Sequence, residues 1–388
     1  MPTKSRRRGS GEGAIYQRES DGRWVAVVDA GYINGKRRRF TAYAKRRKDA
    51  AERLPELKRR AKLAGQQTTS IKTVAEFLTH WMDTSVRKNR APTTIESYQG
   101  AIVNHIVPVI GSRRLAALER MDIQRMLDAV AAKDGVGPRS VENVSAVMRK
   151  ALNDAVKWSL LETNPAQHTE IAKVPQADRK ALTVEQARQL LFHVADDRFE
   201  ALYALAAIYG LRRGECLGLR WSDIDHEARE IHIRQQVVVV NNAPLVTPVK
   251  TKKSSRNLPL LKDIDAALDR RRERQAEERL AAGEHWIEHD LVFASMVGTP
   301  YQPANHHKRW HASLKRAGLP DVPFHSLRHT AASFLVALNV HPRIAMEILG
   351  HANIKTTMEV YSHVQQPGMR DALESVENVL RHTVSSTA

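Results

Sequence analysis

The stretch LGHANIKTTMEVYSH, residues 349–363, places His351 ten positions before Tyr361. Gly350 is a stop signal for the helix that precedes it, and the two threonines at 356 and 357 predict a new short helix that carries Tyr361. Two roles fit a tyrosine in this position. It can pack as a core aromatic residue of an amphipathic segment, or it can be a nucleophile that attacks a phosphate.

Two arginine motifs lie upstream of this stretch, GLRRGE at residues 210–215 and HSLRHT at residues 325–330. Gly210 ends an apolar helical run, and a glycine there lets the backbone turn and direct Arg212 out of the core. His325 and Arg328 stand three positions apart at a helix start, so they share one face beside a helix end that favours anions. Arg212 alone also fits an ordinary surface arginine, but the motifs together indicate a phosphate clamp around a nucleophile.

A metal site is the alternative for the second motif, because His325 and His329 have the i, i+4 spacing of two zinc ligands. No glutamate falls between them in the HExxH manner, and no third ligand is evident nearby. The single cysteine, Cys216, excludes a Cys-based zinc site and an internal disulfide, and its apolar neighbours predict a buried thiol. The residue pattern therefore argues against a metal site, and no cofactor is expected.

The charge of the chain indicates a polyanionic partner. Its 388 residues include 61 Lys and Arg against 43 Asp and Glu, a net charge of +18. Nucleic acid is the first candidate and an acidic membrane surface the second. No apolar run is long enough to span a membrane, and no signal-peptide segment follows the basic N-terminus. Residues 1–65 hold 19 Lys and Arg and 7 Asp and Glu, so a net +12 lies there, as expected of a module that binds DNA phosphates.

Residues 1–65 are expected to form a separate basic, arm-type DNA-binding module. Three strands are predicted at 14–17, 23–30 and 36–43, because Asp21-Gly22 and Asn34-Gly35 between them are hairpin signals. A basic helix is predicted at 46–63. The third strand carries four consecutive cations, Lys36, Arg37, Arg38 and Arg39. They fit a charged edge that prevents aggregation, and they fit a sheet laid in a DNA groove, which the local charge favours.

The remainder of the chain is predicted to form two further domains. Residues 71–165 show helical spacing with no strands, and three candidate DNA contacts lie there, Arg113, Arg114 and Arg149. A polar segment with two Xaa-Pro pairs at 161–180 marks the boundary. The third domain, 178–388, begins with a capping box at Thr183 and mixes helices with strands near 230–240, 245–249 and 257–260. The expected fold class is multidomain and mainly α, with small β-sheets.

The order and flanking residues of these motifs resemble the tyrosine site-specific recombinase family of the phage-integrase kind. The resemblance extends strongly over about residues 178–364. It is looser over 71–160, as the family's helical, SAM-like core-binding domain, and rests on pattern alone over the first 65 residues. It implies a mixed α+β catalytic domain whose catalytic residues are Arg212, Lys250, His325, Arg328, His351 and the nucleophile Tyr361.

Two further assignments follow from the same resemblance. Glu215 matches the family's acidic residue that supports the first arginine. The family lysine lies in a turn between strands, which Lys250 fits, while Lys252 and Lys253 stay open as alternatives.

The resemblance implies DNA strand cleavage and rejoining without a metal ion or ATP. Two planar guanidiniums suit bidentate binding of the phosphodiester oxygens. A phenol with a pKa of about 10 needs help to lose its proton, and Lys250 fits the task of protonating the leaving 5′-oxygen. By the resemblance, Tyr361 becomes joined to the 3′-phosphate, His325 assists proton transfer and His351 hydrogen-bonds to the phosphate.

The expected function is site-specific recombination between attachment sites, which integrates and excises a phage or mobile element. The expected partners are double-stranded DNA at core-type and arm-type sites, a homotetramer on that DNA, a host DNA-bending protein and an excision factor. The expected location is the bacterial cytoplasm, at the nucleoid. An amphipathic helix near 369–381 can pack on its own domain or on a neighbouring protomer. A recombinase of the Xer or resolvase kind, a relaxing topoisomerase and a non-catalytic DNA-binding regulator stay open as alternatives.

Overall fold

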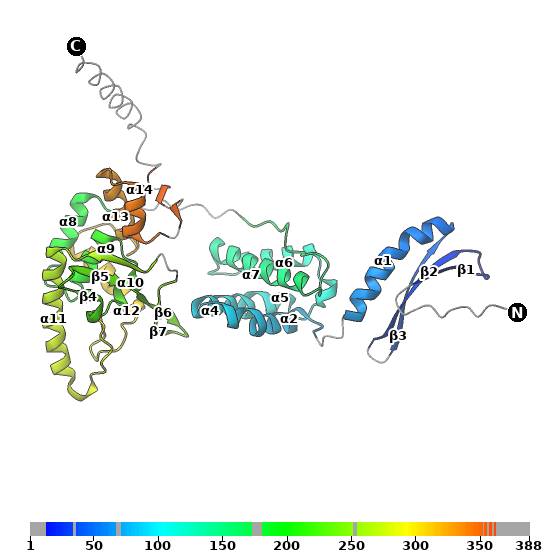
Figure 1. The fold of residues 1–388 in the computed structure, drawn as a ribbon, viewed down its shortest axis with the longest axis horizontal. Coiled ribbons are helices and arrows are strands. Elements are labelled where there is room, and N and C mark those ends of the chain that lie inside the picture. The colour runs from blue at the N-terminus through cyan, green and yellow to red at the C-terminus, as the bar shows by residue number, and fades with distance from the viewer. Residues whose placement is uncertain are drawn as a thin grey trace, which may run out of the picture. The chain divides into compact units, whose positions relative to one another are not determined.

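The computed structural model describes residues 13–33, 36–66, 71–172, 181–250, 254–351, 353–354, 357–358 and 361 (Figure 1). The chain divides into two compact units, Met1–Pro175 and Gln176–Ala388. The hairpin signal at residues 34–35, the alternative lysines at 252–253 and the predicted terminal helix at 369–381 lie outside the described residues. No helix of the described part is long and apolar enough to cross a membrane.

The first unit begins with an antiparallel meander of three strands with one helix beside it (Figure 1). Its elements are β1 (Ala14–Gln17), β2 (Trp24–Ile33), β3 (Lys36–Ala44) and α1 (Arg47–Gln66). Alternation along β2 directs Ala26 and Val28 into a small core, where they meet Ala50 and Leu57 of α1. The predicted three-stranded sheet with its basic helix is confirmed, and β2 continues past its predicted end to Ile33.

The rest of the described first unit is a helical bundle. Its elements are α2 (Val74–Trp81), η1 (Met82–Val86), α3 (Arg87–Asn89), α4 (Pro92–Ala101), η2 (Ile102–Ile106), α5 (Val107–Ile110), η3 (Leu115–Ala117), α6 (Arg120–Ala131) and α7 (Pro138–Lys157). Phe77 and Trp81 of α2 lie in its core, fully buried. The indole of Trp81 donates a 2.9 Å hydrogen bond to Asp154 of α7, so the core is pinned by a satisfied polar contact.

Two helices of the bundle contain a π-helical turn that hydrophobic spacing does not predict. In η1 the backbone N–H of Arg87 donates to the carbonyl of Met82, and in η2 that of Val107 donates to Ile102. Each turn inserts one residue into the helix, so the apolar residues on both sides of it stay buried.

The second unit is mainly helical, with two small antiparallel sheets of order β4-β5-β8 and β6-β7. Its elements are α8 (Val184–His193), α9 (Glu200–Tyr209), α10 (Arg213–Leu217), β4 (Ile224–Asp225), β5 (Glu230–Ile233), β6 (Gln235–Val240), β7 (Ala243–Pro248), β8 (Arg256–Pro259), α11 (Lys262–Ala282), α12 (Pro303–Arg316), α13 (Ser326–Ala337) and α14 (Pro342–Leu349). The predicted capping box is confirmed, since the Thr183 hydroxyl accepts from the backbone N–H of Gln186 over 3.2 Å.

The strand predicted over 230–240 is two strands in the structure. β5 pairs with β8, whereas β6 pairs with β7, and Arg234 separates them. The turn between β6 and β7 has positive φ at both Asn241 and Asn242, as a tight hairpin turn requires. The chain then returns along β7 to Lys250. The backbone N–H of Val249, just before Lys250, donates to the carbonyl of Arg234, so the hairpin brings the predicted lysine back to the junction between β5 and β6.

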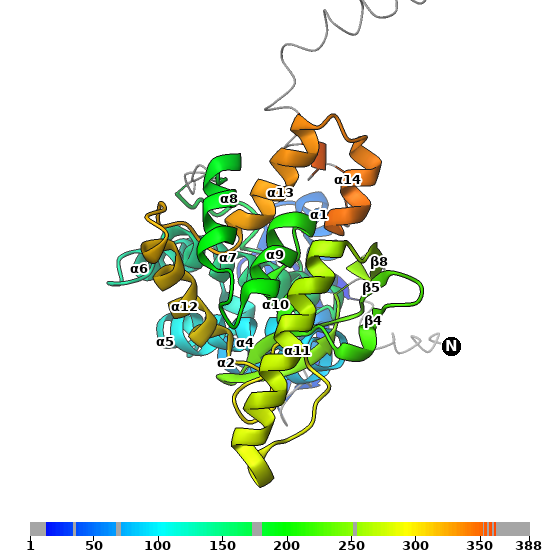
Figure 2. The same ribbon diagram turned by 90° about the vertical axis from the view of Figure 1, so that its left-hand side faces the viewer.

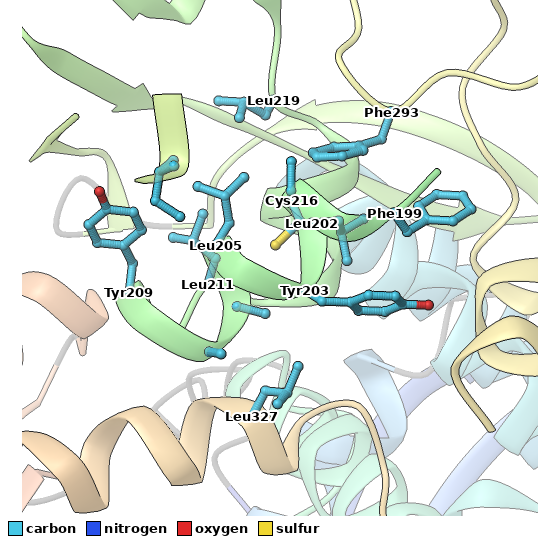
Figure 3. Close-up of a cluster of buried hydrophobic side chains, with 14 of the residues drawn as sticks. Phe199, Leu202, Tyr203, Leu205, Tyr209, Leu211, Cys216, Leu219, Phe293 and Leu327 are labelled. Carbon is cyan, nitrogen blue, oxygen red and sulfur yellow. The ribbon is translucent and has the colours of Figure 1, made fainter. Parts of the chain in front are cut away.

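α9 runs through the main core of the second unit (Figure 3). Leu202, Tyr203 and Leu205 project from it, and Leu327 of α13 points toward it from the facing helix. α13 also lies beside α14 (Figure 2). This apolar packing holds the three segments that carry the motifs. α9 leads into the Arg212 motif, α13 contains Arg328, and α14 ends two residues before His351.

Candidate active site

Arg212 stands at the junction between α9 and α10. Gly210 ends α9 in the left-handed conformation with φ of 65°, which confirms the predicted turn. An added Cβ at Gly210 would lie 2.5 Å from Leu349 Cδ2, so the turn also depends on a close approach. The Arg212 guanidinium donates to Glu215 over 2.6 Å and to the carbonyl of Gly350 over 3.4 Å, and 38% of the side chain is exposed.

Glu215 is a buried carboxylate that holds two arginines. It accepts from the backbone N–H of Arg212 over 3.1 Å and from the Arg256 guanidinium over 3.1 Å, with only 2% of the residue exposed. Burial disfavours its charged form, but the positive charges of Arg256 and Arg212 outweigh this and lower its pKa below the ordinary value. Glu215 therefore stays ionised and fixes the orientation of Arg212, the supporting role predicted for it.

Arg328 is buried beneath Arg212, with 4% of the residue exposed. Its Nη1 donates to the carbonyl of Gly210 over 2.7 Å, whereas its Nη2 has no hydrogen-bond partner among the described residues. Burial, followed by the charge of Arg212, lowers the pKa of Arg328 to about 9. A buried cation with an unused donor is costly. An anion bound here would supply the missing acceptor and offset the repulsion between the two arginines.

His351 follows Gly350, which ends α14 in the left-handed conformation as predicted. Its Nδ1 lies 2.9 Å from the Thr357 hydroxyl. Burial, and then the charges of Arg328, Arg212 and Arg256, lower the pKa of His351 to about 4. The imidazole is therefore neutral near pH 7. In the tautomer that carries the proton on Nε2, Nδ1 accepts from the Thr357 hydroxyl and Nε2 can donate to a phosphate oxygen.

His325 and Lys250 are the two exposed residues of the predicted catalytic set. His325 caps α13, is exposed, and packs edge-on against His329 with ring centroids 4.9 Å apart. Its charge also contributes to the lowered pKa of His351, which places the two histidines in one electrostatic environment. Lys250 is exposed just after β7. Across the described residues, no group of three or more His, Cys, Asp or Glu side chains is arranged to hold a metal ion.

Tyr361 lies in a different environment from the arginines. Only 2% of the residue is exposed, and its ring packs against Val336 of α13 and Ala345 of α14. Its hydroxyl donates to the backbone carbonyl of Val340, and burial raises its pKa above the ordinary value. The structure thus shows the packed-aromatic arrangement that the sequence left open beside the nucleophile.

One buried arginine of this site was not anticipated from the sequence. Arg256 begins β8 and donates to Oε2 of Glu215, the oxygen that also accepts from the backbone N–H of Arg212. It follows a run of lysines and serines, and nothing in this residue pattern marks it as the arginine whose side chain is buried. The signal is tertiary, because Glu215 and the end of α14 approach Arg256 from distant parts of the chain.

The predicted DNA contacts differ in how far their side chains are already used. Arg39 is exposed and pairs with Asp29 at 3.7 Å, while Lys36, Arg37 and Arg38 share β3 with it, their side chains lying outside the described residues. Arg113 pairs with Asp122 at 3.0 Å and Arg114 is exposed. Arg149 is half-buried and donates to the carbonyl of Ala166 and the hydroxyl of Ser145. Its guanidinium is thus partly used inside the bundle.

Comparison with family models gives two matches along the chain. Residues 180–367 match the model described as phage integrase family. Residues 73–130 match the model described as phage integrase, N-terminal SAM-like domain.

Relatives and solved structures extend the similarity. The chain is 28% identical to a protein of Caldanaerobacter subterraneus subsp. tengcongensis named tyrosine recombinase XerC-like, over 89% of this chain and 93% of that protein. It is 27% identical to an integrase of Streptomyces ambofaciens, over 97% and 98%. Its fold is similar to that of the Tn1549 transposon integrase in complex with circular intermediate DNA, with a TM-score of 0.65 at 19% identity, covering 78% of this chain and 99% of that one.

Proposed function

This chain belongs to the phage integrase family of tyrosine recombinases and is a site-specific DNA recombinase, and from that premise we propose that it moves a mobile element between attachment sites through a 3′-phosphotyrosyl intermediate. The observation that carries the catalytic proposal is the unused donor of Arg328. It lies buried beside Arg212, with a neutral His351 next to both. This arrangement suits one phosphodiester anion better than any other ligand class.

The roles of the residues follow from charge. Arg212 and Arg328 bind the non-bridging oxygens of the scissile phosphate, and His351 donates to one of them. The Tyr361 oxygen attacks phosphorus and loses its proton with the help of His325, while the bond from phosphorus to the 5′-oxygen breaks. Lys250 gives that leaving oxygen a proton. The phosphotyrosine then stores the bond energy for rejoining. Preorganised donors of this kind contribute roughly 3–4 kcal/mol each to transition-state binding.

The nucleophile must change its surroundings for this reaction. The Tyr361 hydroxyl donates to a backbone carbonyl, and its ring packs on α13 and α14. In this arrangement the hydroxyl is engaged with Val340 and is not free to attack a phosphate. We therefore propose that DNA binding releases Tyr361 from the carbonyl of Val340. The hydroxyl exchanges one acceptor for a catalytic base, so the loss of the hydrogen bond costs about 1 kcal/mol.

We also propose three DNA-facing parts, 1–65 for arm-type sites, 71–165 for core-type sites and 178–388 for catalysis. The basic residues on β3 and α1 support binding of arm-type sites by residues 1–65. Because this part is tethered to the rest of the chain, binding at one site raises the local concentration at the other. The assembly would be a homotetramer on two duplexes, aided by a host bending protein and an excision factor, at the nucleoid in the cytoplasm. The segment 369–381 is the candidate for contacts between protomers.

A chromosome-dimer recombinase of the Xer kind is the second candidate, and the similarity to a XerC-like protein favours it. The N-terminal sheet with its basic helix argues for the integrase, because a second DNA-reading module is useful to an enzyme with two kinds of site. Recombination of plasmids that carry candidate attachment sites, with and without residues 1–65, separates the two. Dependence on residues 1–65 for the integrative reaction supports the integrase, and independence supports the other.

A suicide core site that traps the covalent adduct tests the catalytic proposal. The wild-type protein should form a protein–DNA species that survives denaturation, and Tyr361→Phe should form none. Tyr209→Phe is the matched control, because Tyr209 also donates its hydroxyl from the core to a backbone carbonyl, that of Pro259, over 2.6 Å. An adduct with Tyr361→Phe would refute the assignment of the nucleophile.

A further inference from the structure

We propose that Arg256 is a positioning residue for strand cleavage, which sets Arg212 and His351 relative to each other from beneath the site. This inference rests on the proposed function. Arg256 is nearly inaccessible, with 7% of its side chain exposed, so the residue acts on the phosphate only through its neighbours.

The guanidinium of Arg256 joins two distant segments to its own connection. Its Nε donates to the carbonyl of Ile348 over 2.9 Å, its Nη1 to the carbonyl of Ser254 over 3.0 Å, and its Nη2 to Glu215 over 3.1 Å. All three nitrogens of the planar fork are therefore used. A lysine keeps the charge but lacks this geometry, because its ammonium is a single point at the end of a flexible stem.

The contact with Glu215 transmits the position of Arg256 to Arg212. One oxygen of Glu215, Oε2, accepts from both Arg256 and the backbone N–H of Arg212, while the other accepts from the Arg212 guanidinium. With the carboxylate held on both sides, the Arg212 fork has one orientation. Without Arg256, Oε2 loses a charged donor. Only the two hydrogen bonds with Arg212 then hold the carboxylate, so its orientation is less restricted.

The contact with the end of α14 transmits the position of Arg256 to His351. Arg256 binds the carbonyl of Ile348 and packs against Gly350, where an added Cβ would lie 2.6 Å from Nη1. Arg212 reaches the carbonyl of the same Gly350. Two arginines linked through Glu215 thus hold the turn that immediately precedes His351.

The contact with Ser254 ties this arrangement to the β7–β8 connection. That connection also carries Lys250, the proposed proton donor to the leaving oxygen. Arg256 therefore donates hydrogen bonds to the Glu215 helix, to the α14 turn and within the β7–β8 connection. The three groups that must meet one phosphate are mounted on those three segments.

The test is single-turnover cleavage of a suicide core site at saturating Arg256→Lys protein. We expect the rate of adduct formation to fall roughly 30- to 100-fold, because small misplacements of reacting groups carry losses of this order. The dissociation constant for core DNA should stay within about threefold of the wild type, because only 7% of the Arg256 side chain is exposed. A rate within about threefold of the wild type would overturn the proposal.

Arg271→Lys is the matched control for a purely structural effect. Arg271 is equally buried in the same unit, donates to the carbonyl of Val292 over 3.0 Å and pairs with Glu278 at 2.8 Å, but has no contact with the site residues. Assayed well below both melting temperatures, it should cleave at the wild-type rate. An equal loss in both variants would mean that Arg256 acts only through folding, and would overturn the proposal.

A double-mutant cycle with Glu215→Gln shows whether Arg256 acts through Glu215. The combined variant should cleave little more slowly than the slower single variant, because both changes release the same carboxylate link. If the fold-losses in cleavage rate of the two single variants multiply in the double variant, Arg256 does not act through Glu215. The wild-type protein and Tyr361→Phe are run beside them, and absence of a wild-type adduct would count against the proposed function, not against Arg256.

Discussion

Arg328 and Tyr361 are almost equally buried, yet their polar atoms are in opposite states. Arg328 has a nitrogen with no partner among the described residues, and Arg212, Glu215 and Arg256 surround it. Tyr361 has its one polar atom occupied by the carbonyl of Val340. With the proposed roles, the contrast means that the phosphate-binding half of the site is assembled before DNA arrives, whereas the proposed nucleophile is held elsewhere. Substitutions in each half distinguish these two states.

The largest effect is expected from Arg328→Ala, which empties the assembled half. Adduct formation at saturating DNA should fall on the order of 10²- to 10³-fold, as when one preorganised donor to a developing charge is removed. Arg198→Ala is a control for loss of an ion-paired, half-buried arginine, because Arg198 pairs with Glu278 away from the site. A loss that disappears when the DNA concentration is raised would show that Arg328 serves ground-state binding instead.

The free energy of unfolding is expected to depend on pH through His351, with a change of about 2–3 kcal/mol. Burial and then Arg328, Arg212 and Arg256 lower its pKa to about 4, whereas in the unfolded chain it is about 6.5. Between these values the unfolded state binds a proton that the folded state lacks. The contribution of His351 to the free energy of unfolding is therefore fully present above pH 6.5 and is lost as the pH falls from 6.5 through 4.

Histidine NMR spectra check this, with His351→Gln used for assignment. The His351 signal should show a neutral imidazole at pH 6, and the pKa of His351 should rise in Arg328→Ala because the charge of Arg328, which lowers it, is gone. A wild-type pKa near 6.5 would contradict the assembled arrangement of the cations.

A smaller effect is expected from Gly350→Ala, which disturbs the joint between the two halves. Gly350 has φ of 64°, and the new Cβ would meet the Arg256 guanidinium, so the free energy of unfolding should fall by roughly 1–3 kcal/mol. Gly135→Ala is the control, since Gly135 has φ of 76° but open space around it. Melting temperatures of the two variants separate the collision with Arg256 from backbone strain, and equal losses would remove the collision from the account.

The smallest effect, and the only gain, is expected from Ala345→Leu, which crowds the storage site of Tyr361. Overpacking a core position costs about 1–3 kcal/mol, and part of that cost should favour release of the phenol, so adduct formation should rise about threefold to tenfold. Ala267→Leu crowds the main core of the same unit away from Tyr361 and should give no gain. A slower Ala345→Leu would mean that the packed position helps catalysis.

The sequence predicted those parts of the fold that depend on local chemistry. The turns at Gly210 and Gly350 need a residue that accepts positive φ, and the capping box at Thr183 joins groups three residues apart. The Asn241-Asn242 hairpin is equally local. Such signals are written in a few adjacent residues, so they can be recognised without knowing what packs against them. The domain limits and the catalytic roles stay predictions.

The parts that escaped prediction depend on segments far apart in the chain. Arg256 meets Ile348, 92 positions away, and Glu215, 41 positions away. Tyr361 finds its acceptor at Val340, across a helix whose packing angle no residue pattern specifies. The π-helical turns each insert one extra residue into a helix of the bundle core, and the spacing of apolar residues in the sequence does not reveal this insertion.

The burial of Cys216 has a practical consequence for watching the nucleophile move. It is the only cysteine of the chain, it is fully buried, and burial raises its pKa well above the ordinary value, so thiol reagents will leave it untouched. Met358 is 45% exposed and three positions from Tyr361. A Met358→Cys chain would therefore accept one fluorophore at one place, without prior removal of the native thiol. Its emission on adding DNA would report in real time when the tyrosine segment leaves its pocket.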